Sequence, residues 1–111
     1  MTISESNFES DSDVFTPRES FLTYADSMAT YFELNPDKIL TITGHCDYQG
    51  SHKYNDDLGL RRAESAKKFL IDEKAIKVEI KVATKGKREP TSDNSTAEGM
   101  AKNRRVHFLI E

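Results

Sequence analysis

The chain has 111 residues, of which 16 are basic and 19 acidic, and its formal net charge is −3. This length fits one domain over residues 1–111, which can bury about two-thirds of its unfolded surface. The basic residues are dispersed among acidic ones, which argues against the concentrated positive face that nucleic-acid binding requires. No apolar run approaches the ~20 residues of a membrane span, no signal-peptide pattern opens the chain, and the single cysteine excludes an internal disulfide.

The first 15 residues are rich in Ser, Asp and Glu and hold few large apolar groups. This composition is typical of a loop. We therefore expect residues 1–7 to be flexible and one edge strand to lie around Phe8.

A helix is predicted over residues 17–34. Thr16 can cap its N-terminus, Pro17 suits the first helical position and Glu19 completes a capping box. Apolar residues recur at helical spacing, at Phe21, Leu22, Ala25, Met28, Ala29 and Phe32. This stripe is predicted to pack in the core, and Pro36 ends the pattern.

Residues 39–43 are rich in β-branched side chains and predict a strand, with Leu40 and Ile42 on one face. A polar loop then leads to a second helix, predicted over residues 57–73. The amide or carboxylates of residues 55–57 can cap its start. Its buried face is expected to consist of Leu58, Ala63, Ala66, Phe69 and Leu70.

Residues 77–83 alternate charged and β-branched side chains, which is typical of a half-buried strand. A loop over residues 84–94 ends at Ser95-Thr96-Ala97-Glu98, a second capping box that predicts a short helix through about Lys102. The last strand is predicted over residues 105–110, and its inner face is expected to hold Val106, Phe108 and Ile110.

Taken together, these elements predict an α+β fold of the order βαβαβ(short α)β. Helices are expected to pack on one face of a mixed sheet. Strands joined through helices are expected to lie parallel, by right-handed crossover, and the final pair of strands is expected to be antiparallel.

A series of residues after the first predicted helix resembles a known family. The series reads Gly44-His45-Cys46-Asp47, Gly50, Asn55, Leu58-Gly59 and Arg62-Ala63, with Phe8-Glu9-Ser10-Asp11 before it and Asn103-Arg104-Arg105-Val106 after it. It resembles the OmpA-like peptidoglycan-binding domain of outer-membrane protein A and the peptidoglycan-associated lipoproteins. Two departures are that Cys46 stands where relatives usually have Thr, and Gly59-Leu60 replaces the more usual Ser-Glu.

The resemblance implies a binding protein and not an enzyme, with no cofactor and no metal. The stem peptides of most Gram-negative bacteria contain meso-diaminopimelate, whose side chain ends in an ammonium and a carboxylate. Asp47 can take the ammonium, and Arg62 can hold the carboxylate with two parallel hydrogen bonds. Both side chains are therefore expected to face a common space.

The resemblance assigns further residues to the same site: Asn55, Arg104, Asp11, and the backbone from Cys46 to Gly50. Plainer interpretations exist for several of these. Asp47 and Arg62 can form a surface salt bridge, Asn55 can cap a helix, and Cys46 can fill a buried gap. Affinity is expected to be modest and to be supported by the many copies of the ligand in a wall.

Three other functions can be read from the same residues. The run His45-Cys46-Asp47 with His52 has the chemistry of zinc ligands, although adjacent residues at a strand end point to opposite faces. Cys46 with His52 or His107 has two parts of a thiol hydrolase, without an evident orienting group or oxyanion donors. A domain of this fold that has become a protein-interaction scaffold would bind no peptidoglycan.

The resemblance also implies a location and a partner. We expect a periplasmic domain of an outer-membrane-associated protein, which reaches the membrane only through an anchor or barrel upstream of residue 1. Its expected partner is the peptidoglycan stem peptide, and no nucleic acid is expected.

Overall fold

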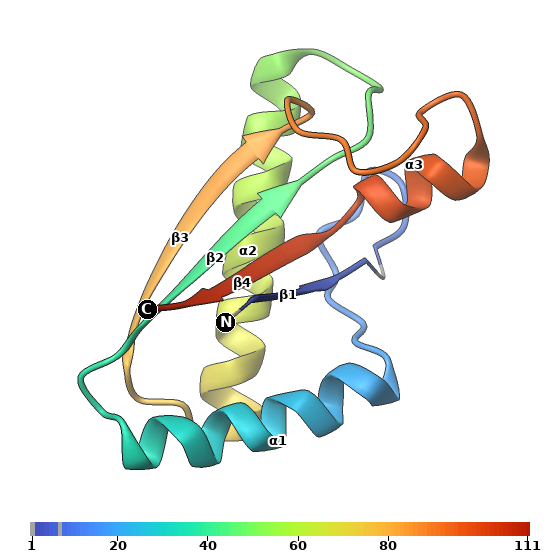
Figure 1. Cartoon of the computed structure of the whole chain (residues 1–111). Coiled ribbons are helices and arrows are strands. Elements are labelled where there is room, and N and C mark those ends of the chain that lie inside the picture. The colour runs from blue at the N-terminus through green and yellow to red at the C-terminus, as the bar shows by residue number, and fades with distance from the viewer. Residues whose placement is uncertain (1, 7) are drawn as a thin grey trace.

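The computed structural model of the protein describes residues 2–6 and 8–111. Its elements are β1 (Thr2–Glu5), α1 (Glu19–Leu34), β2 (Ile39–His45), α2 (His52–Lys74), β3 (Glu79–Gly86), α3 (Ala97–Asn103) and β4 (Val106–Ile110) (Figure 1). This order confirms the predicted α+β arrangement. Among the described residues, no helix combines the length and the apolar character that crossing a bilayer requires.

The four strands form one mixed sheet in the order β1-β4-β2-β3. β2 and β3 are parallel and are joined through α2, as expected for strands linked by a helix. β4 lies between β1 and β2 and is antiparallel to both. The final two strands therefore run in opposite directions, as predicted, but they do not pair with each other.

One face of the sheet is buried by the two long helices. Ile42 lies opposite Phe108 on one side and Val82 on the other, so apolar side chains form a row across three strands. Along β2 and β4, buried side chains alternate with partly exposed ones. The predicted inner faces of both strands are thus confirmed, and α1 and α2 supply the rest of the same core.

The apolar stripe of α1 forms one part of this core. Phe21, Ala25, Met28 and Phe32 are all buried, and burying an aromatic or Met side chain stabilises a fold by about 1.5–3 kcal/mol. The Phe21 ring lies 5.0 Å from the Phe108 ring, centroid to centroid. Helix α1 is therefore held to the sheet by the stripe that the sequence predicts.

The N-terminal segment differs from the prediction. The edge strand is Thr2–Glu5, whereas Phe8 is a buried core residue outside any strand. α1 begins at Glu19, and its N-cap position is Arg18, which makes no side-chain cap hydrogen bond. The predicted start at residue 17 is wrong because the buried Glu5 carboxylate accepts the backbone N–H of Arg18 at 3.0 Å, and its Oε1 accepts Nη2 of Arg18 at 2.7 Å.

Helix α2 begins five residues earlier than predicted. Its N-cap is Ser51, whose Oγ accepts the backbone N–H of Tyr54 at 3.1 Å. The predicted capping by residues 55–57 is therefore wrong, and Asn55 lies inside the helix with a buried side chain.

The predicted elements of the C-terminal half form with small shifts at their ends. β3 begins at Glu79 instead of residue 77, and it continues to Gly86. The short helix α3 is confirmed. Its cap is Thr96 and not Ser95, since the Thr96 Oγ1 accepts the backbone N–H of Gly99 at 2.9 Å.

Two glycines allow α2 to lie directly against β2. A Cβ placed on Gly44 would come within 1.7 Å of the backbone oxygen of Gly59, and a Cβ on Gly59 would come within 2.4 Å of Oγ1 of Thr84. Backbone thus meets backbone at the point where the strand approaches its end. The departure from Ser-Glu at Gly59-Leu60 has a structural reason here, because this packing leaves no space for a side chain at residue 59.

Substituting Gly44 tests this close approach. Gly44→Ala should lower the free energy of unfolding by about 3 kcal/mol or more, because the added methyl group meets backbone that cannot move independently. Thr43→Ala, on the same strand but on the partly exposed face, should cost less than about 1 kcal/mol. Urea denaturation followed by circular dichroism measures both, and equal losses would contradict the proposed packing.

Candidate functional site

The predicted site residues gather at one end of the sheet. This end is formed by the end of β2, the start of α2, the residues before β4 and the segment of residues 8–12 (Figure 1). We refer to these residues together as the β2 end. They come from four separate stretches of the chain, so the geometry of the site depends on how the stretches are joined.

Arg62 joins three of these stretches. Its Nε donates to the carbonyl of Ser12 at 2.8 Å, Nη1 to the carbonyl of His45 at 3.0 Å, and Nη2 to the carbonyl of Glu9 at 3.1 Å. Its guanidinium carbon also lies 5.0 Å from the centroid of the Phe8 ring, a cation–π distance. Only 1% of the residue is exposed, and burial lowers the pKa of its guanidinium, which nevertheless stays charged.

Asp47 is also buried, but its cationic partner is Arg104. The Asp47 Oδ2 accepts Nη1 of Arg104 at 2.9 Å, and its Oδ1 accepts the backbone N–H of Gln49 at 3.0 Å. Arg104 is fixed in turn, because its Nε donates to the carbonyl of Phe8 at 2.9 Å. The side chains of Arg104 and Asp47 are 15% and 7% exposed, which makes this a largely desolvated ion pair.

The sequence predicts that Asp47 and Arg62 face a common open space. The structure places both in the β2 end, but each has its own partners and neither is open to solvent. It also brings Arg104 into direct contact with Asp47. The plain alternative, a surface salt bridge between Asp47 and Arg62, is not what forms.

The loop after Asp47 is held by the side chain of Asn55. The Asn55 Nδ2 donates to the carbonyl of Gln49 at 2.6 Å. Gly50 has a φ of +87°, and a Cβ there would lie 3.2 Å from the ring of Tyr54, so glycine suits this turn. Asn55 therefore supports the loop through its side chain, although the sequence had suggested a helix cap or a ligand contact.

Lys87 also fixes this loop. Its Nζ donates to the carbonyl of Gly50 at 2.6 Å, and the backbone N–H of Cys46 donates to the carbonyl of Gly86 at 2.8 Å. Sequence reasoning missed Lys87, because its partners are backbone atoms 37 residues away in the chain. A charged residue in a predicted loop gives no signal of such a contact.

Cys46 has the properties of a buried structural residue. Its Sγ donates to the carbonyl of Asn55 at 3.3 Å, and burial raises the pKa of its thiol. A nucleophilic cysteine needs a lowered pKa and exposure. Across residues 2–6 and 8–111, no three or more His, Cys, Asp and Glu side chains are grouped so that they could hold a metal ion.

Asp11 lies on the exposed rim of the β2 end. Its φ is +57°, a left-handed conformation, and the turn around it is closed by a hydrogen bond of 3.2 Å from the Ser12 N–H to the Glu9 carbonyl. The hydroxyl of Tyr54 donates to Oδ1 of Asp11 at 2.9 Å, and this hydrogen bond raises the pKa of Tyr54. Tyr54, a second residue that sequence reasoning missed, thus connects α2 to the turn.

His45 is buried beside positive charge. Burial, together with Arg105, His107 and Lys85, lowers its pKa to about 4. Within the described part of the chain, its Nδ1 has no hydrogen-bond partner. The imidazole is therefore neutral at pH 7, and it supports the site through its backbone, whose carbonyl accepts from Arg62.

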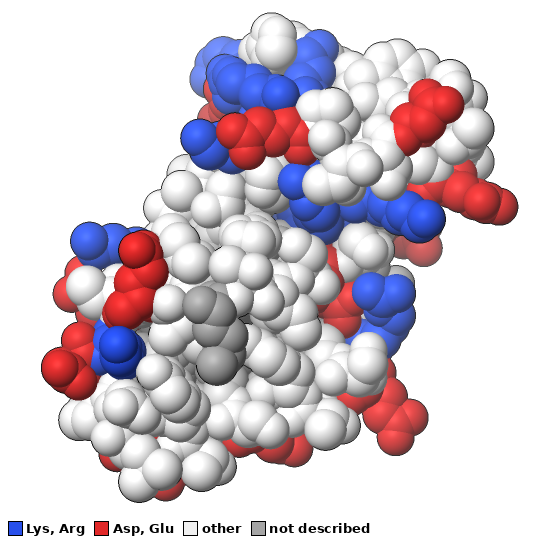
Figure 2. Space-filling view, in the orientation of Figure 1, with Lys and Arg blue, Asp and Glu red and all other residues white. Residues whose placement is uncertain are grey.

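The surface around this end carries both signs of charge. Figure 2 shows Lys and Arg next to Asp and Glu at the upper end of the molecule, above a face that is largely uncharged. Arg88 and Asp56 form an ion pair through two hydrogen bonds between the guanidinium and the carboxylate. On this face the positive charges do not form a continuous patch.

Comparison with known proteins gives several matches. The sequence model described as the OmpA family matches residues 7–104. Outer membrane porin F of Pseudomonas aeruginosa is 35% identical over 92 residues, which cover 80% of this chain and 26% of the porin. The peptidoglycan-associated lipoprotein of Legionella pneumophila is 32% identical over 96 residues, which cover 86% of this chain and 54% of the lipoprotein. The chain thus spans about half or less of the length of these relatives.

Solved structures share the fold. The crystal structure of the peptidoglycan-associated lipoprotein from Burkholderia pseudomallei superimposes with a TM-score of 0.81 at 24% identity, covering 97% of this chain and 89% of that one. The C-terminal domain of Helicobacter pylori MotB superimposes with a TM-score of 0.78 at 20% identity, covering 98% and 84% respectively. The architecture built from the residues above is therefore one that occurs in known proteins.

Arg62 should be essential to the fold as well as to the site. Arg62→Ala should lower the free energy of unfolding by at least about 3 kcal/mol, because it leaves the buried carbonyl of His45 and the partly buried carbonyls of Glu9 and Ser12 without a donor. The neighbouring Arg61→Ala is a matched control. It removes only an exposed pair with Asp13 and should cost less than about 1 kcal/mol. Equal losses in urea denaturation would contradict the assigned role.

His45 predicts a stability that depends on pH. Its pKa is lower in the folded protein than the ordinary 6.5, so the unfolded chain binds more protons between pH 6.5 and about 4. The contribution is fully present above pH 6.5 and is lost as the pH falls to about 4, by up to about 3 kcal/mol. The free energy of unfolding, measured by urea denaturation at several pH values in this range, should change less with pH for His45→Gln than for the wild type. His52→Gln, at the exposed start of α2, is the control and should keep the wild-type slope.

Proposed function

Since this chain belongs to the OmpA family, we propose that it binds peptidoglycan non-covalently, through the diaminopimelate of the stem peptide. The observation that carries the proposal is the largely desolvated Asp47–Arg104 pair, beside the buried cation of Arg62. One anion and two cations thus lie within a single framework. A zwitterionic end group requires an anion and a cation at a fixed separation.

The Asp47–Arg104 pair can accept a zwitterion without leaving a charge unpaired. When the ligand ammonium binds Asp47 and its carboxylate binds the arginines, one internal ion pair is exchanged for two ion pairs with the ligand. Separating two buried charges with nothing between them would be costly. A neutral or singly charged ligand would leave one side chain without a partner, which favours a zwitterion.

Arg62 retains donors for this role. A guanidinium has five N–H groups, and three of the nitrogen donors here are used by the carbonyls of Glu9, Ser12 and His45. One N–H remains on each of Nη1 and Nη2. A ligand carboxylate can accept from these two N–H groups while the three carbonyls stay bound, and Arg104 adds a further positive charge.

The loop residues supply a preformed frame. Asn55 and Lys87 fix the carbonyls of Gln49 and Gly50, so the backbone from residue 46 to residue 50 is ordered before a ligand arrives. This lowers the entropy that is lost on binding. We propose that Asp11, exposed on the rim of the β2 end, contacts the stem peptide beyond its diaminopimelate.

The setting proposed for this activity is the periplasm. The peptidoglycan-associated lipoprotein and the outer membrane porin among the relatives are named as envelope proteins. We propose that this domain links an outer-membrane-associated parent protein to the cell wall. Many ligand copies in one polymer would compensate for a modest affinity at each site.

Sedimentation with purified sacculi tests the binding and the residues. The wild-type protein should sediment with Gram-negative sacculi, whereas Asp47→Asn and Arg104→Gln should each bind at least about tenfold more weakly, because each removes one of the charges that meets the zwitterion. Arg88→Gln removes an exposed arginine outside the site and should bind as the wild type does. Circular dichroism should show that all variants are folded.

Synthetic stem peptides separate the ligand from the wall. In calorimetry, a peptide with free diaminopimelate should bind at least about tenfold more tightly than one whose side-chain carboxylate is amidated. Equal affinities would contradict recognition of the zwitterion. A wild-type protein that stays in the supernatant when sacculi are sedimented would contradict peptidoglycan binding altogether and would favour an interaction scaffold with the same fold.

A further inference from the structure

Two of the four tyrosines of the chain lie at the β2 end and have exposed rings. Tyr48 is 52% exposed and Tyr54 is 39% exposed. Tyr24 and Tyr31, by contrast, belong to α1 and pack against the hydrophobic core. An exposed ring contributes little to folding, whereas Tyr is enriched where proteins contact their partners. The tyrosines of this chain are thus divided between the core and the rim of the candidate site.

The two tyrosines at the rim differ in what their side chains contact. The hydroxyl of Tyr54 donates to Oδ1 of Asp11 at 2.9 Å, and its ring lies 3.2 Å from the position that a Cβ on Gly50 would take. Tyr54 therefore supports the loop and the turn beside it. The side chain of Tyr48 has no hydrogen bond, ion pair or aromatic contact in the described part of the chain. Nothing in the fold accounts for its ring.

The backbone that carries the Tyr48 ring is fixed by its neighbours. Oδ1 of Asp47 accepts the backbone N–H of Gln49 at 3.0 Å, which closes a turn with Tyr48 at its centre. Nζ of Lys87 donates to the carbonyl of Gly50 at 2.6 Å and to that of Tyr48 at 3.5 Å. A Tyr side chain has only two χ angles to order, so a ring on a fixed turn loses little entropy when it binds a ligand.

We propose that the Tyr48 ring binds the glycan strand of peptidoglycan by stacking against one face of a sugar ring, an inference that rests on the proposed function. The face of an aromatic ring is negative, and the C–H groups on the face of a sugar ring are weakly positive, so the two attract. Only two residues of the stem peptide separate the diaminopimelate from the glycan, a span of about 7 Å. One ligand can therefore reach both Asp47 and the ring of the next residue.

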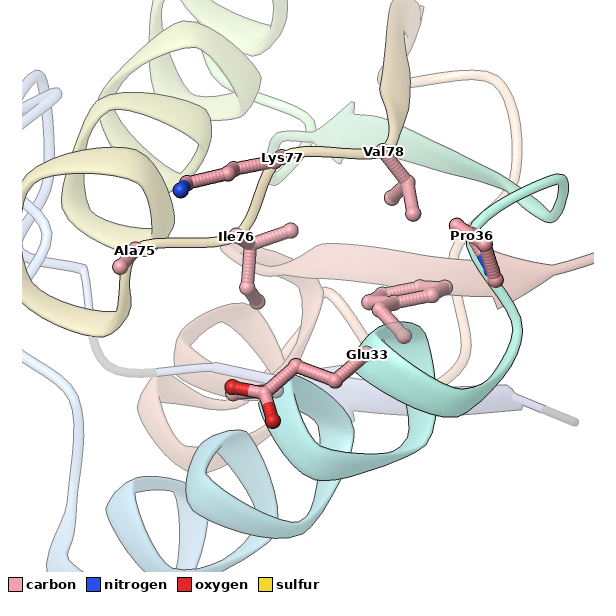
Figure 3. Close-up of a pocket in the computed structure, with 8 residues that line it drawn as sticks. Glu33, Pro36, Ala75, Ile76, Lys77 and Val78 are labelled. Carbon is pink, nitrogen blue, oxygen red and sulfur yellow. The ribbon is translucent and has the colours of Figure 1, made fainter.

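The hollow at the other end of the molecule does not offer such a surface. This cavity of about 270 Å³ lies between the end of α1 and the connection from α2 to β3 (Figure 3). Its lining includes the aliphatic side chains of Ile76 and Val78, and its one aromatic residue in the described chain, Phe32, is only 3% exposed. The hydroxyl groups of a sugar need hydrogen-bond partners, which aliphatic walls do not supply. The exposed ring of Tyr48 suits a sugar better.

Calorimetry with two related ligands tests the inference. One ligand is a synthetic stem peptide with free diaminopimelate, and the other is the same peptide attached to the disaccharide of the glycan strand. The wild-type protein should bind the disaccharide-peptide at least about threefold more tightly, because stacking adds a contact to a ligand that is already held. Tyr48→Ala should bind the two ligands equally. Tyr48→Phe keeps the ring and should keep the wild-type difference.

Ile71→Ala is the matched control, since Ile71 is 44% exposed on α2 and lies outside the site, and it should keep the wild-type difference. Equal affinities of the wild type for the two ligands would overturn the glycan contact and leave the proposed function intact. A difference that persists in Tyr48→Ala would overturn the role of Tyr48. If the wild type binds neither ligand, the proposed function fails and this inference fails with it. Circular dichroism should show that all variants are folded.

Discussion

The structure of the candidate site depends on the buried guanidinium of Arg62. A single side chain on α2 holds backbone carbonyls from the N-terminal segment and from the end of β2. Because a buried carbonyl without a hydrogen-bond donor is costly, Arg62 fixes these segments relative to one another. The cation that the family resemblance assigns to ligand binding is therefore first a structural residue, and any ligand it binds must share it with the backbone.

The glycine contact between β2 and α2 makes this arrangement possible. Gly44 and Gly59 let strand and helix approach until their backbones touch, which brings Arg62, one turn further along the helix, within reach of the His45 carbonyl. Asp47 then follows His45 by two residues and meets Arg104, which lies just before β4. A local absence of side chains thus determines where three charged groups are placed.

The sequence predicts those parts of the molecule that follow a regular period. The alternation of Leu40 and Ile42, and of Val106, Phe108 and Ile110, gives both central strands, and the stripe from Phe21 to Phe32 gives α1. It does not choose Ser51 as the cap of α2, because Ser51, Asn55 and Asp57 are all capable caps and the choice depends on where β2 ends. It also cannot show that Arg62 is buried, since the partners of Arg62 are backbone carbonyls, which every residue possesses. The site residues could be listed from the motif, but the pairing of Asp47 with Arg104 depends on tertiary structure alone.

Glu5 has a consequence for where this unit starts. It ends the outermost strand, yet its carboxylate also holds the first turn of α1 through Arg18. The family model begins to match at residue 7. A fragment trimmed to that limit would therefore lose the strand that covers the outer edge of β4, and it would also release the start of a helix thirteen residues downstream. The folded unit thus begins earlier than the recognisable pattern.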